Sequence, residues 1–221
     1  MFGCAKDFSF AEPGFSSQSD AHHLNSSQMF CINFFQPLRK SRKDVLGALL
    51  RTWGIGLKGR IVQTGFEKVL STREDMHFDF YVETDLCERV FFEIKYTENC
   101  FSSVSFDGAR AEFYRKWLSY SSYLADLPIN ELETHYQIYR NISYVRSSCD
   151  YVVFLFPHGN ELLKKEMNQI GKKVLMKNVK WVNAEEIVSH LTEVFKNVKS
   201  SPRILKHYQE LVRRYFGWYV G

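Results

Sequence analysis

Three charged residues lie in two consecutive segments that are otherwise rich in aromatic and branched aliphatic side chains. Asp79 belongs to FDFYV, and Glu93 and Lys95 belong to FFEIKYTE. Neighbouring carboxylates repel each other unless a cation neutralises them. Hard oxygen ligands without His or Cys suit Mg²⁺, which typically takes one or two carboxylates plus phosphate oxygens of a substrate. The Lys95 ammonium would then hold an attacking water and stabilise negative charge that develops on the phosphate.

The period of a β-strand decides whether these charges meet. Side chains alternate between the two faces of a strand. In the first segment, one face is predicted to carry Phe78, Phe80 and Val82. The opposite face carries Asp79 and Tyr81, so the acidic side chain is predicted to point away from the core.

The second segment repeats the pattern, with Val90, Phe92 and Ile94 on one face and Phe91, Glu93 and Lys95 on the other. If both apolar faces meet the same core, facing residues have numbers of equal parity, which requires a turn of three or five residues around Leu86. That register pairs Asp79 with Glu93 or Lys95, with Cβ atoms about 4.5 to 5.5 Å apart. The charges are then gathered on an open face, where the alternative is a solvated sheet surface with a salt bridge.

The elements around this pair are predicted to form one α/β sheet with helices on both faces. Helical spacing over 43–53 and a Gly-rich connection, GIGLKG, precede strands at about 60–70, 76–83 and 89–96. Helices follow near 107–124 and 131–147, and then the apolar strand DYVVFLF, which is predicted to be central. A helix in NELLKKEMNQIG, a strand in VKWV, a helix opened by Asn183 with Glu186, and a last helix from Ser201 complete the order.

This arrangement resembles the restriction-endonuclease-like, or PD-(D/E)XK, nuclease superfamily over about residues 43–157. The matching positions are Asp79, Glu93 and Lys95. The resemblance implies a mixed β-sheet and an endonuclease, of restriction or DNA-processing type, that hydrolyses phosphodiester bonds in DNA. It implies that Asp79, Glu93 and the backbone carbonyl of Ile94 bind Mg²⁺, with Mn²⁺ as a substitute ion, and that Lys95 assists the water.

The chain departs from the superfamily pattern at two positions. Phe78 stands where a proline often precedes the aspartate, and Asp44 is the only acid between Lys43 and Trp53, where a helical glutamate is often found. Three further residues are candidates for a supporting role: Glu67 as a substitute for that glutamate, Gln137 near the metal, and His77 as an auxiliary base. Each of them is also compatible with a structural or surface role.

Charge is unevenly distributed along the 221 residues, although the net charge is only +4. Residues 38–60 carry seven basic residues against one acid, 61–106 carry nine acids against four bases, and 164–221 carry twelve bases against five acids. The pattern fits either ordinary solvated faces or a polyanion-binding surface around a cation site. The candidate nucleic-acid contacts are Arg39, Lys40, Arg42, Lys43, Arg110, Arg115, Lys116, Arg140 and Arg146.

Composition restricts the class of protein. With 45% hydrophobic and 16% aromatic residues the chain is predicted to fold by itself, as a weakly ordered arm over 1–27 and a single domain over 28–221. The N-terminus has no secretory signal, and no apolar run is long enough to span a membrane. Five scattered cysteines without CxxC spacing indicate neither a disulfide framework nor a zinc site, and a cytoplasmic location is expected.

Three interpretations remain open from the sequence. The first is the Mg²⁺-dependent deoxyribonuclease, with a homodimer as an arrangement that suits double-strand cleavage. The second is a non-catalytic nucleic-acid-binding protein on the same fold, and the third is a nuclease acting on RNA. The retention of Asp79, Glu93 and Lys95 together favours the first over the second.

Overall fold

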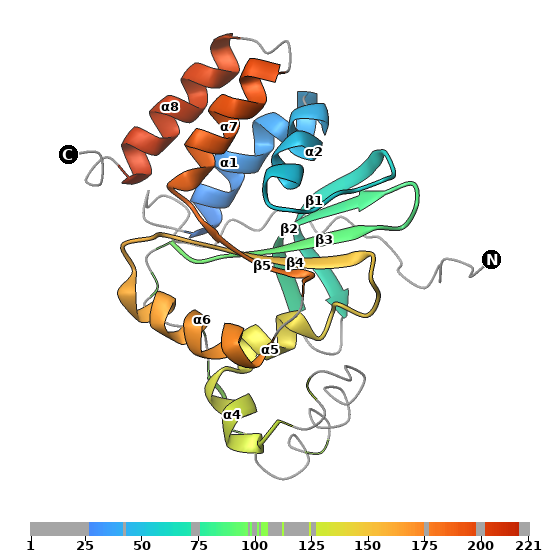
Figure 1. Cartoon of the computed structure of the whole chain (residues 1–221), viewed down its shortest axis with the longest axis vertical. Helices are drawn as coiled ribbons and strands as arrows, with labels where there is room; N and C mark the ends of the chain where they lie inside the picture. Colours follow the sequence, from blue (N-terminus) through green and yellow to red (C-terminus); the bar gives the residue numbers. More distant parts are fainter. Residues whose placement is uncertain are drawn as a thin grey trace.

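A single five-stranded mixed sheet organises the protein, with helices over both of its faces (Figure 1). The computed structural model describes residues 27–41, 43–71, 76–96, 98, 101, 103–105, 112, 124, 127–174, 177–197 and 202–216. The strands lie in the order β1–β2–β3–β4–β5, the same as in the sequence. The predicted α/β fold with a mixed sheet is thereby confirmed.

The strands divide into an antiparallel and a parallel part. β1 (Ile61–Ser71), β2 (Met76–Thr84) and β3 (Arg89–Ile94) form the predicted meander. β4 (Asp150–Phe156) and β5 (Val179–Asn183) run parallel to β3, with β4 between β3 and β5. β4 is therefore covered on both faces, as its continuous apolar sequence indicates.

The predicted register between β2 and β3 is confirmed. Phe80 faces Phe92, and Val82 faces Val90, so facing residues have numbers of equal parity. The ladder closes at Glu83 and Arg89, which leaves residues 84–88 as an odd-length turn around Leu86. The four apolar side chains of these two pairs are fully buried in one core, as the alternation predicts.

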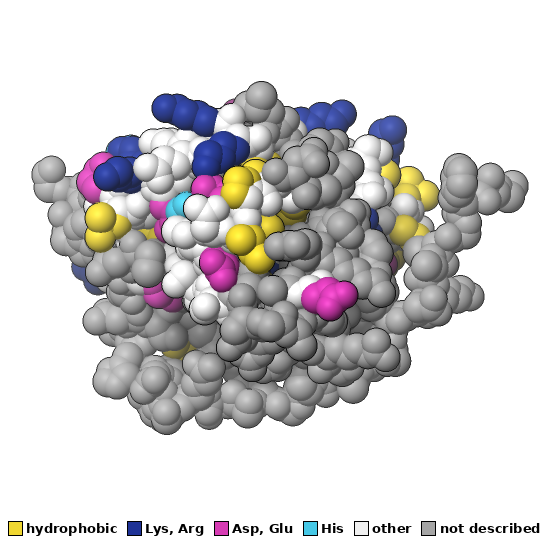
Figure 2. Space-filling model, turned by 90° about the horizontal axis from the view of Figure 1, so that it is seen from below, with side chains coloured by type: hydrophobic (Ala, Val, Ile, Leu, Met, Phe, Trp, Pro, Cys, Tyr) yellow, Lys and Arg dark blue, Asp and Glu magenta, His cyan; other side chains and the backbone are white. Residues whose placement is uncertain are grey.

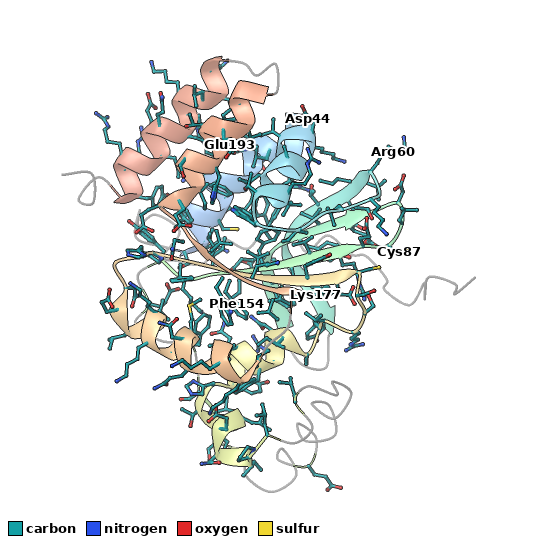
Figure 3. All side chains as sticks on the ribbon, viewed as in Figure 1. Asp44, Arg60, Cys87, Phe154, Lys177 and Glu193 are labelled. Carbon is teal, nitrogen blue, oxygen red and sulfur yellow. The ribbon has the colours of Figure 1, made fainter. Side chains whose placement is uncertain are left out.

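Two cores lie on opposite faces of the sheet. One is formed with α1 (Ser27–Ser41), α2 (Lys43–Thr52), α7 (Glu186–Asn197) and α8 (Pro202–Phe216). The other is formed with α5 (Tyr136–Ile142), α6 (Glu161–Lys173) and Leu132 of α4 (Ile129–Thr134), the outermost of these helices (Figure 1). Phe154 of β4 belongs to this second core, where its ring stacks on Trp181 with centroids 4.6 Å apart (Figure 3).

The helices differ from the expectation at two places, and a third expectation is not tested. α1 was not predicted, because Pro37 lies within it and a basic run ends it. The single helix expected over 131–147 is two short helices, α4 and α5, that meet at His135. The helix expected over 107–124 lies outside the described residues, apart from positions 112 and 124.

The Gly-rich connection between α2 and β1 holds a carboxylate from its own chain. Glu88 is buried, and its side chain accepts hydrogen bonds from the backbone N–H groups of Lys58 (3.0 Å) and Gly59 (2.8 Å). A Cβ atom at Gly59 would lie 2.7 Å from the Thr84 hydroxyl oxygen, so only glycine fits there. These N–H groups therefore anchor the β2–β3 turn rather than a phosphate.

Two further features concern the length of the helices and the state of the cysteines. No helix among the described residues is long and apolar enough to cross a membrane. Cys31 is a buried free thiol and Cys149 an exposed one, whereas Cys87 is disulfide-bonded, which the scattered cysteine pattern did not indicate. Cys87 lies in the turn between β2 and β3 (Figure 3).

Candidate active site

Asp79 lies at the point where β2 separates from β3. The last paired positions of the two strands are Phe80 and Phe92, so Asp79 is the first residue beyond the ladder. Its Oδ2 atom accepts a hydrogen bond of 2.6 Å from the backbone N–H of Ile94. A side-chain carboxylate thus takes the place that a backbone carbonyl of β2 would hold if the ladder continued.

Glu93 is held by three donors from two elements. Its side chain is buried, with Oε1 lying 3.2 Å from the Lys95 ammonium and 2.5 Å from the Gln137 amide nitrogen. Its Oε2 accepts a hydrogen bond of 2.9 Å from the Asn141 amide. Because an ionised carboxylate can only accept, these donors match its charged form. The structure therefore brings Glu93, Lys95 and Gln137 together.

Lys95 lies between the Glu93 carboxylate and an aromatic ring. Its Nζ atom is 5.5 Å from the centroid of the Phe101 ring, and 12% of its side chain is exposed. A cation over a ring face in a partly desolvated place is attracted by the ring. The ammonium is consequently confined to the site instead of extending into solvent.

The two acidic groups interact electrostatically. Burial raises the pKa of Asp79 well above its usual value, and the Glu93 carboxylate raises it further. The Ile94 N–H and the Lys95 ammonium act in the opposite direction but do not compensate. Negative charge is therefore in excess at this point, which a divalent cation would neutralise.

The donor set fits a small oxygen-liganded cation. The described residues contain no group of three or more His, Cys, Asp and Glu side chains arranged to hold a metal ion. A site here would thus use two carboxylates and a backbone oxygen. In a strand, the N–H and C=O of one residue point to the same edge. Since the Ile94 N–H points at Asp79, its carbonyl faces the same edge, as the resemblance implies.

Glu67 lies beside this site on β1. Phe66 faces Phe80 and Lys68 faces Phe78, which sets Glu67 opposite Asp79 in the register. Glu67 has a φ of 47°, in the left-handed region that side chains rarely adopt, and its charge raises the pKa of Asp79.

Two side chains contact the Glu67 carboxylate. The Gln28 amide donates to it at 3.3 Å, and His77 Nδ1 lies 4.0 Å from its other oxygen. The predicted supporting residues Glu67 and His77 therefore lie next to each other, on the β1–β2 side of Asp79.

One predicted face assignment is wrong. Phe78 does not share the core of Phe80 but packs on the opposite side of the sheet, with ring centroids 4.9 Å from Phe91 and 5.6 Å from Tyr144. The alternation fails there because β2 leaves β3 after Phe80. The face that carries Glu93 is also not open: α5 covers it, and Glu93 is only 5% exposed.

The first helix contributes residues that sequence reasoning missed. Gln28 and Cys31 both belong to α1, and the Cys31 thiol donates to the Asp79 backbone carbonyl at 3.5 Å. Burial raises the pKa of this thiol, and the Asp79 carboxylate raises it further. The helical glutamate of the superfamily pattern was expected within residues 43–53. The helix that reaches the site is instead α1, and it presents the Gln28 amide. Asn141 was also missed, because one asparagine on a helix forms no recognisable motif.

The described basic candidates contact aromatic rings or a backbone carbonyl. Arg39 lies over the Phe66 ring (5.6 Å), the Lys43 ammonium donates to the Val62 carbonyl (3.2 Å), and Arg140 and Arg146 lie over Tyr136 and Tyr144 (5.3 Å each). The other candidates fall outside the part of the chain whose side chains are described: Lys40, Arg42, Arg110, Arg115 and Lys116.

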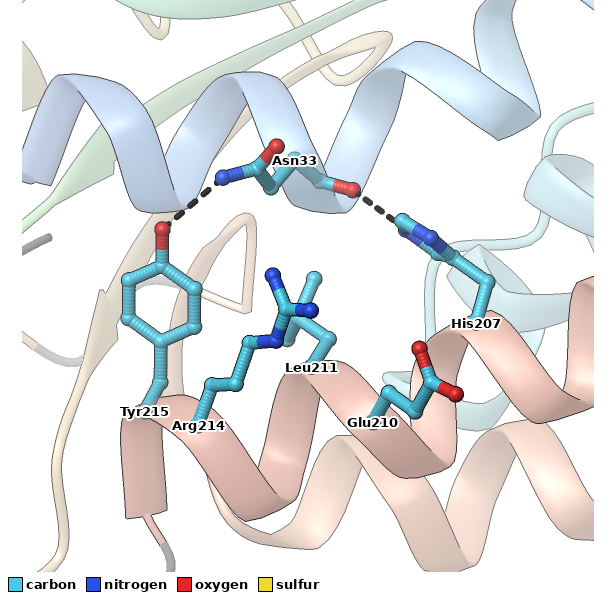
Figure 4. A pocket seen from close by; sticks show the side chains of 6 residues that line it. All are labelled: Asn33, His207, Glu210, Leu211, Arg214 and Tyr215. Atoms are coloured by element: carbon cyan, nitrogen blue, oxygen red, sulfur yellow. Dashed lines mark hydrogen bonds between the residues drawn. The ribbon is translucent and has the colours of Figure 1, made fainter.

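A separate pocket of about 170 Å³ lies between α1 and α8 (Figure 4). Asn33 spans it, donating from its amide to the Tyr215 hydroxyl (2.8 Å), while its backbone carbonyl contacts His207 Nε2 (2.9 Å). None of the predicted site residues lines this pocket. Tyr215 nevertheless contacts the segment that follows β3, because its carbonyl accepts a hydrogen bond of 2.6 Å from the Tyr96 hydroxyl.

Comparison with known proteins gives one family. The model described as Restriction Endonuclease associating with ARP matches residues 5–216. No curated protein and no solved structure matches the chain. A restriction endonuclease family indicates a nuclease, and hence a hydrolase, in agreement with the restriction-endonuclease-like resemblance of the sequence. The chain therefore belongs to the family described as Restriction Endonuclease associating with ARP.

Proposed function

We propose that the protein is a Mg²⁺-dependent endonuclease, of restriction or DNA-processing type, that hydrolyses phosphodiester bonds in DNA. Family membership supports a nuclease. The observation that carries the finer assignment is the Glu93–Lys95 pair, 3.2 Å apart, beside the Asp79 carboxylate at the separation of β2 and β3. Two carboxylates and an ammonium at one sheet edge are suited to phosphoryl chemistry.

The proposal gives each residue a distinct role. Asp79, Glu93 and the Ile94 carbonyl would hold the metal. A bound Mg²⁺ polarises the phosphodiester and lowers the pKa of a coordinated water. The Lys95 ammonium orients the attacking water and stabilises negative charge on the phosphate, while Gln137 keeps Glu93 in place from α5.

The raised pKa of Asp79 makes cation binding depend on pH. Burial and the Glu93 charge let Asp79 keep its proton to a higher pH than an ordinary carboxyl group, and only the deprotonated carboxylate can bind a cation. Cation affinity is consequently expected to rise with pH. The raised pKa of Asp79 thus fits a metal ligand, because a bound cation would stabilise its ionised form.

DNA contact is proposed through the basic flanks of the sequence. In the view from below, the described Lys and Arg side chains lie mainly along one edge, while most Asp and Glu side chains lie below them (Figure 2). The basic run of Arg39, Lys40, Arg42 and Lys43, at the junction of α1 and α2, is the candidate for this contact. Replacing all four with alanine should reduce the salt dependence of DNA binding. An unchanged slope of log affinity against log salt concentration would contradict this role.

Cleavage assays separate the proposal from its alternatives. Purified protein is incubated with supercoiled, linear and single-stranded DNA and with RNA, in Mg²⁺ or in chelator. The wild type should cut DNA only with Mg²⁺, whereas Glu93→Ala and Lys95→Ala should lose at least about 100-fold in rate. Glu161→Ala and Lys165→Ala, which change exposed residues of α6, serve as controls of matched charge.

Several outcomes would overturn this proposal. DNA cleavage that persists in both Glu93→Ala and Lys95→Ala would exclude the assigned site. Cleavage of RNA alone would make the protein a ribonuclease, and DNA binding without turnover would make it a binding protein on this fold. Cleavage assays on DNA and RNA, together with a DNA-binding measurement, therefore distinguish the three interpretations.

The proposal also includes a homodimer, an association with ARP and a cytoplasmic location. A homodimer would place two sites on opposite DNA strands, and sedimentation at the mass of a single chain would contradict it. The family description names an association with ARP, which we carry over to this chain and which a pull-down with ARP would test. The single domain over 28–221 and the cytoplasmic location remain predictions.

A further inference from the structure

We infer that Asn141 is a positioning residue that fixes the orientation of the Glu93 carboxylate for cation binding. This inference rests on the proposed function. Asn141 is fully buried, and its amide donates to Glu93 Oε2 at 2.9 Å. It is separate from the groups at Oε1, where Lys95 and Gln137 bind.

The α5 helix donates hydrogen bonds to both carboxylate oxygens of Glu93. Gln137 and Asn141 are four residues apart, so they lie on the same face of the helix, one turn from each other. One amide donates to Oε1 and the other to Oε2, so that the carboxylate is fixed against rotation about its last side-chain bond. With two donors at Oε1 and one at Oε2, the carboxylate held in this way presents its remaining lone pair, on Oε2, in one direction.

The amide of Asn141 can have only one orientation. Its Oδ1 atom is buried and has no hydrogen-bond partner in the described part of the chain. Inverting the amide would place this oxygen against the Glu93 carboxylate, where two acceptors would repel. A buried acceptor without a partner is unfavourable. The unpaired Oδ1 atom of Asn141 is explained if the amide nitrogen is required as a donor to Glu93.

Hydrogen bonds to metal-binding carboxylates affect affinity because they orient the ligand before the metal arrives. Loss of the Asn141 donor would free Oε2, and the Lys95 ammonium could then draw Glu93 away from Asp79. The expected consequence is weaker cation binding in a protein that remains folded. A merely structural asparagine would change stability without changing cation affinity.

The test measures Mg²⁺ binding to the full chain by titration calorimetry, well below the unfolding temperature, with folding checked by circular dichroism. Asn141→Ala should weaken Mg²⁺ binding about 10- to 100-fold. Asn141→Leu, which fills the same volume without a donor, should weaken it equally and tests the idea if the alanine variant does not fold. DNA cleavage at limiting Mg²⁺ should fall in parallel and recover partly at high Mg²⁺.

Asn178 provides the matched control. It is also a buried asparagine, but its amide donates to backbone carbonyls, including that of Asp150 at 2.7 Å. Asn178→Ala should have a lower melting temperature than the wild type and bind Mg²⁺ with unchanged affinity. Wild-type affinity in Asn141→Leu would overturn the inference. A wild-type chain that neither binds Mg²⁺ nor cleaves DNA would contradict the proposed function instead.

Discussion

Replacing Asp79 with asparagine is expected to stabilise the metal-free protein at neutral and alkaline pH. The carboxylate is ionised there at a cost, because burial and then the Glu93 charge raise its pKa well above the usual value. An asparagine is neutral at every pH. Its carbonyl oxygen can still accept the hydrogen bond from the Ile94 N–H, so the substitution removes the charge and keeps the contact.

The direction of the pH dependence follows from linkage. A carboxyl whose pKa is raised by folding stabilises the folded state fully below the unfolded pKa of about 3.9, and this contribution is lost as the pH rises through the folded pKa. An imperfectly compensated buried polar or charged group typically costs about 1 to 3 kcal/mol. We therefore expect the free energy of unfolding of Asp79→Asn to exceed that of the wild type by about this amount at pH 8, and the two to converge toward pH 4.

Urea unfolding in chelator between pH 4 and pH 8 measures this difference. About 1 kcal/mol corresponds to a shift of roughly 2 to 4 °C in melting temperature for a chain of this size. Asp85→Asn is a control of opposite sign, because hydrogen bonds from the Arg60 backbone and side chain lower the pKa of Asp85. An Asp79→Asn variant that is less stable than the wild type at pH 8 would refute the electrostatic account of the site.

Three further predictions concern the cation and the scaffold. At a pH low enough for Asp79 to hold its proton, Mg²⁺ binding should release that proton, so that the calorimetric heat depends on the buffer in the wild type but not in Asp79→Asn; a buffer-independent heat across the acidic range would contradict the coupling. Gly59→Ala should lower stability by about 1 to 3 kcal/mol, since its Cβ would lie 2.7 Å from Thr84 Oγ1, and an unchanged melting temperature would show that the turn can adjust. Glu166→Gln should cost about 1 to 3 kcal/mol in urea unfolding, because Glu166 contacts His135 Nδ1 at 2.7 Å; a wild-type midpoint would show that this pair does not stabilise the fold.

The β2–β3 register could be predicted because a simple physical rule determines it. The side-chain period of a strand is two, and two apolar faces have to meet one core. Phe80 and Phe92 face each other accordingly. The same rule failed at Phe78, because alternation within a strand says nothing about where neighbouring strands separate. That separation is a tertiary feature, and the candidate site lies at it.

The missed elements have their own physical reasons. α1 contains Pro37, which usually interrupts a helix, yet Phe30, Phe34 and Leu38 follow helical spacing and are buried in the core. Gln137 was a candidate because some members of the superfamily that the sequence resembles place a glutamine on a later helix near the metal. Asn141 was not found, since its contact with Glu93 depends on how α5 packs over the sheet. Contacts of this kind are not encoded in local spacing.

The pairing of α1 with α8 has a consequence for the order in which the site is completed during synthesis. The Tyr215 carbonyl accepts from the Tyr96 hydroxyl, next to Lys95, and the Tyr208 hydroxyl donates to the Phe34 carbonyl of α1. A ribosome makes α8 only after all five strands. Until it docks, α1 lacks one of its packing partners, and the hydroxyl of Tyr96, the residue after Lys95, lacks its hydrogen bond to the Tyr215 carbonyl. A chain interrupted before α8 would therefore carry every proposed catalytic residue without part of the packing behind α1.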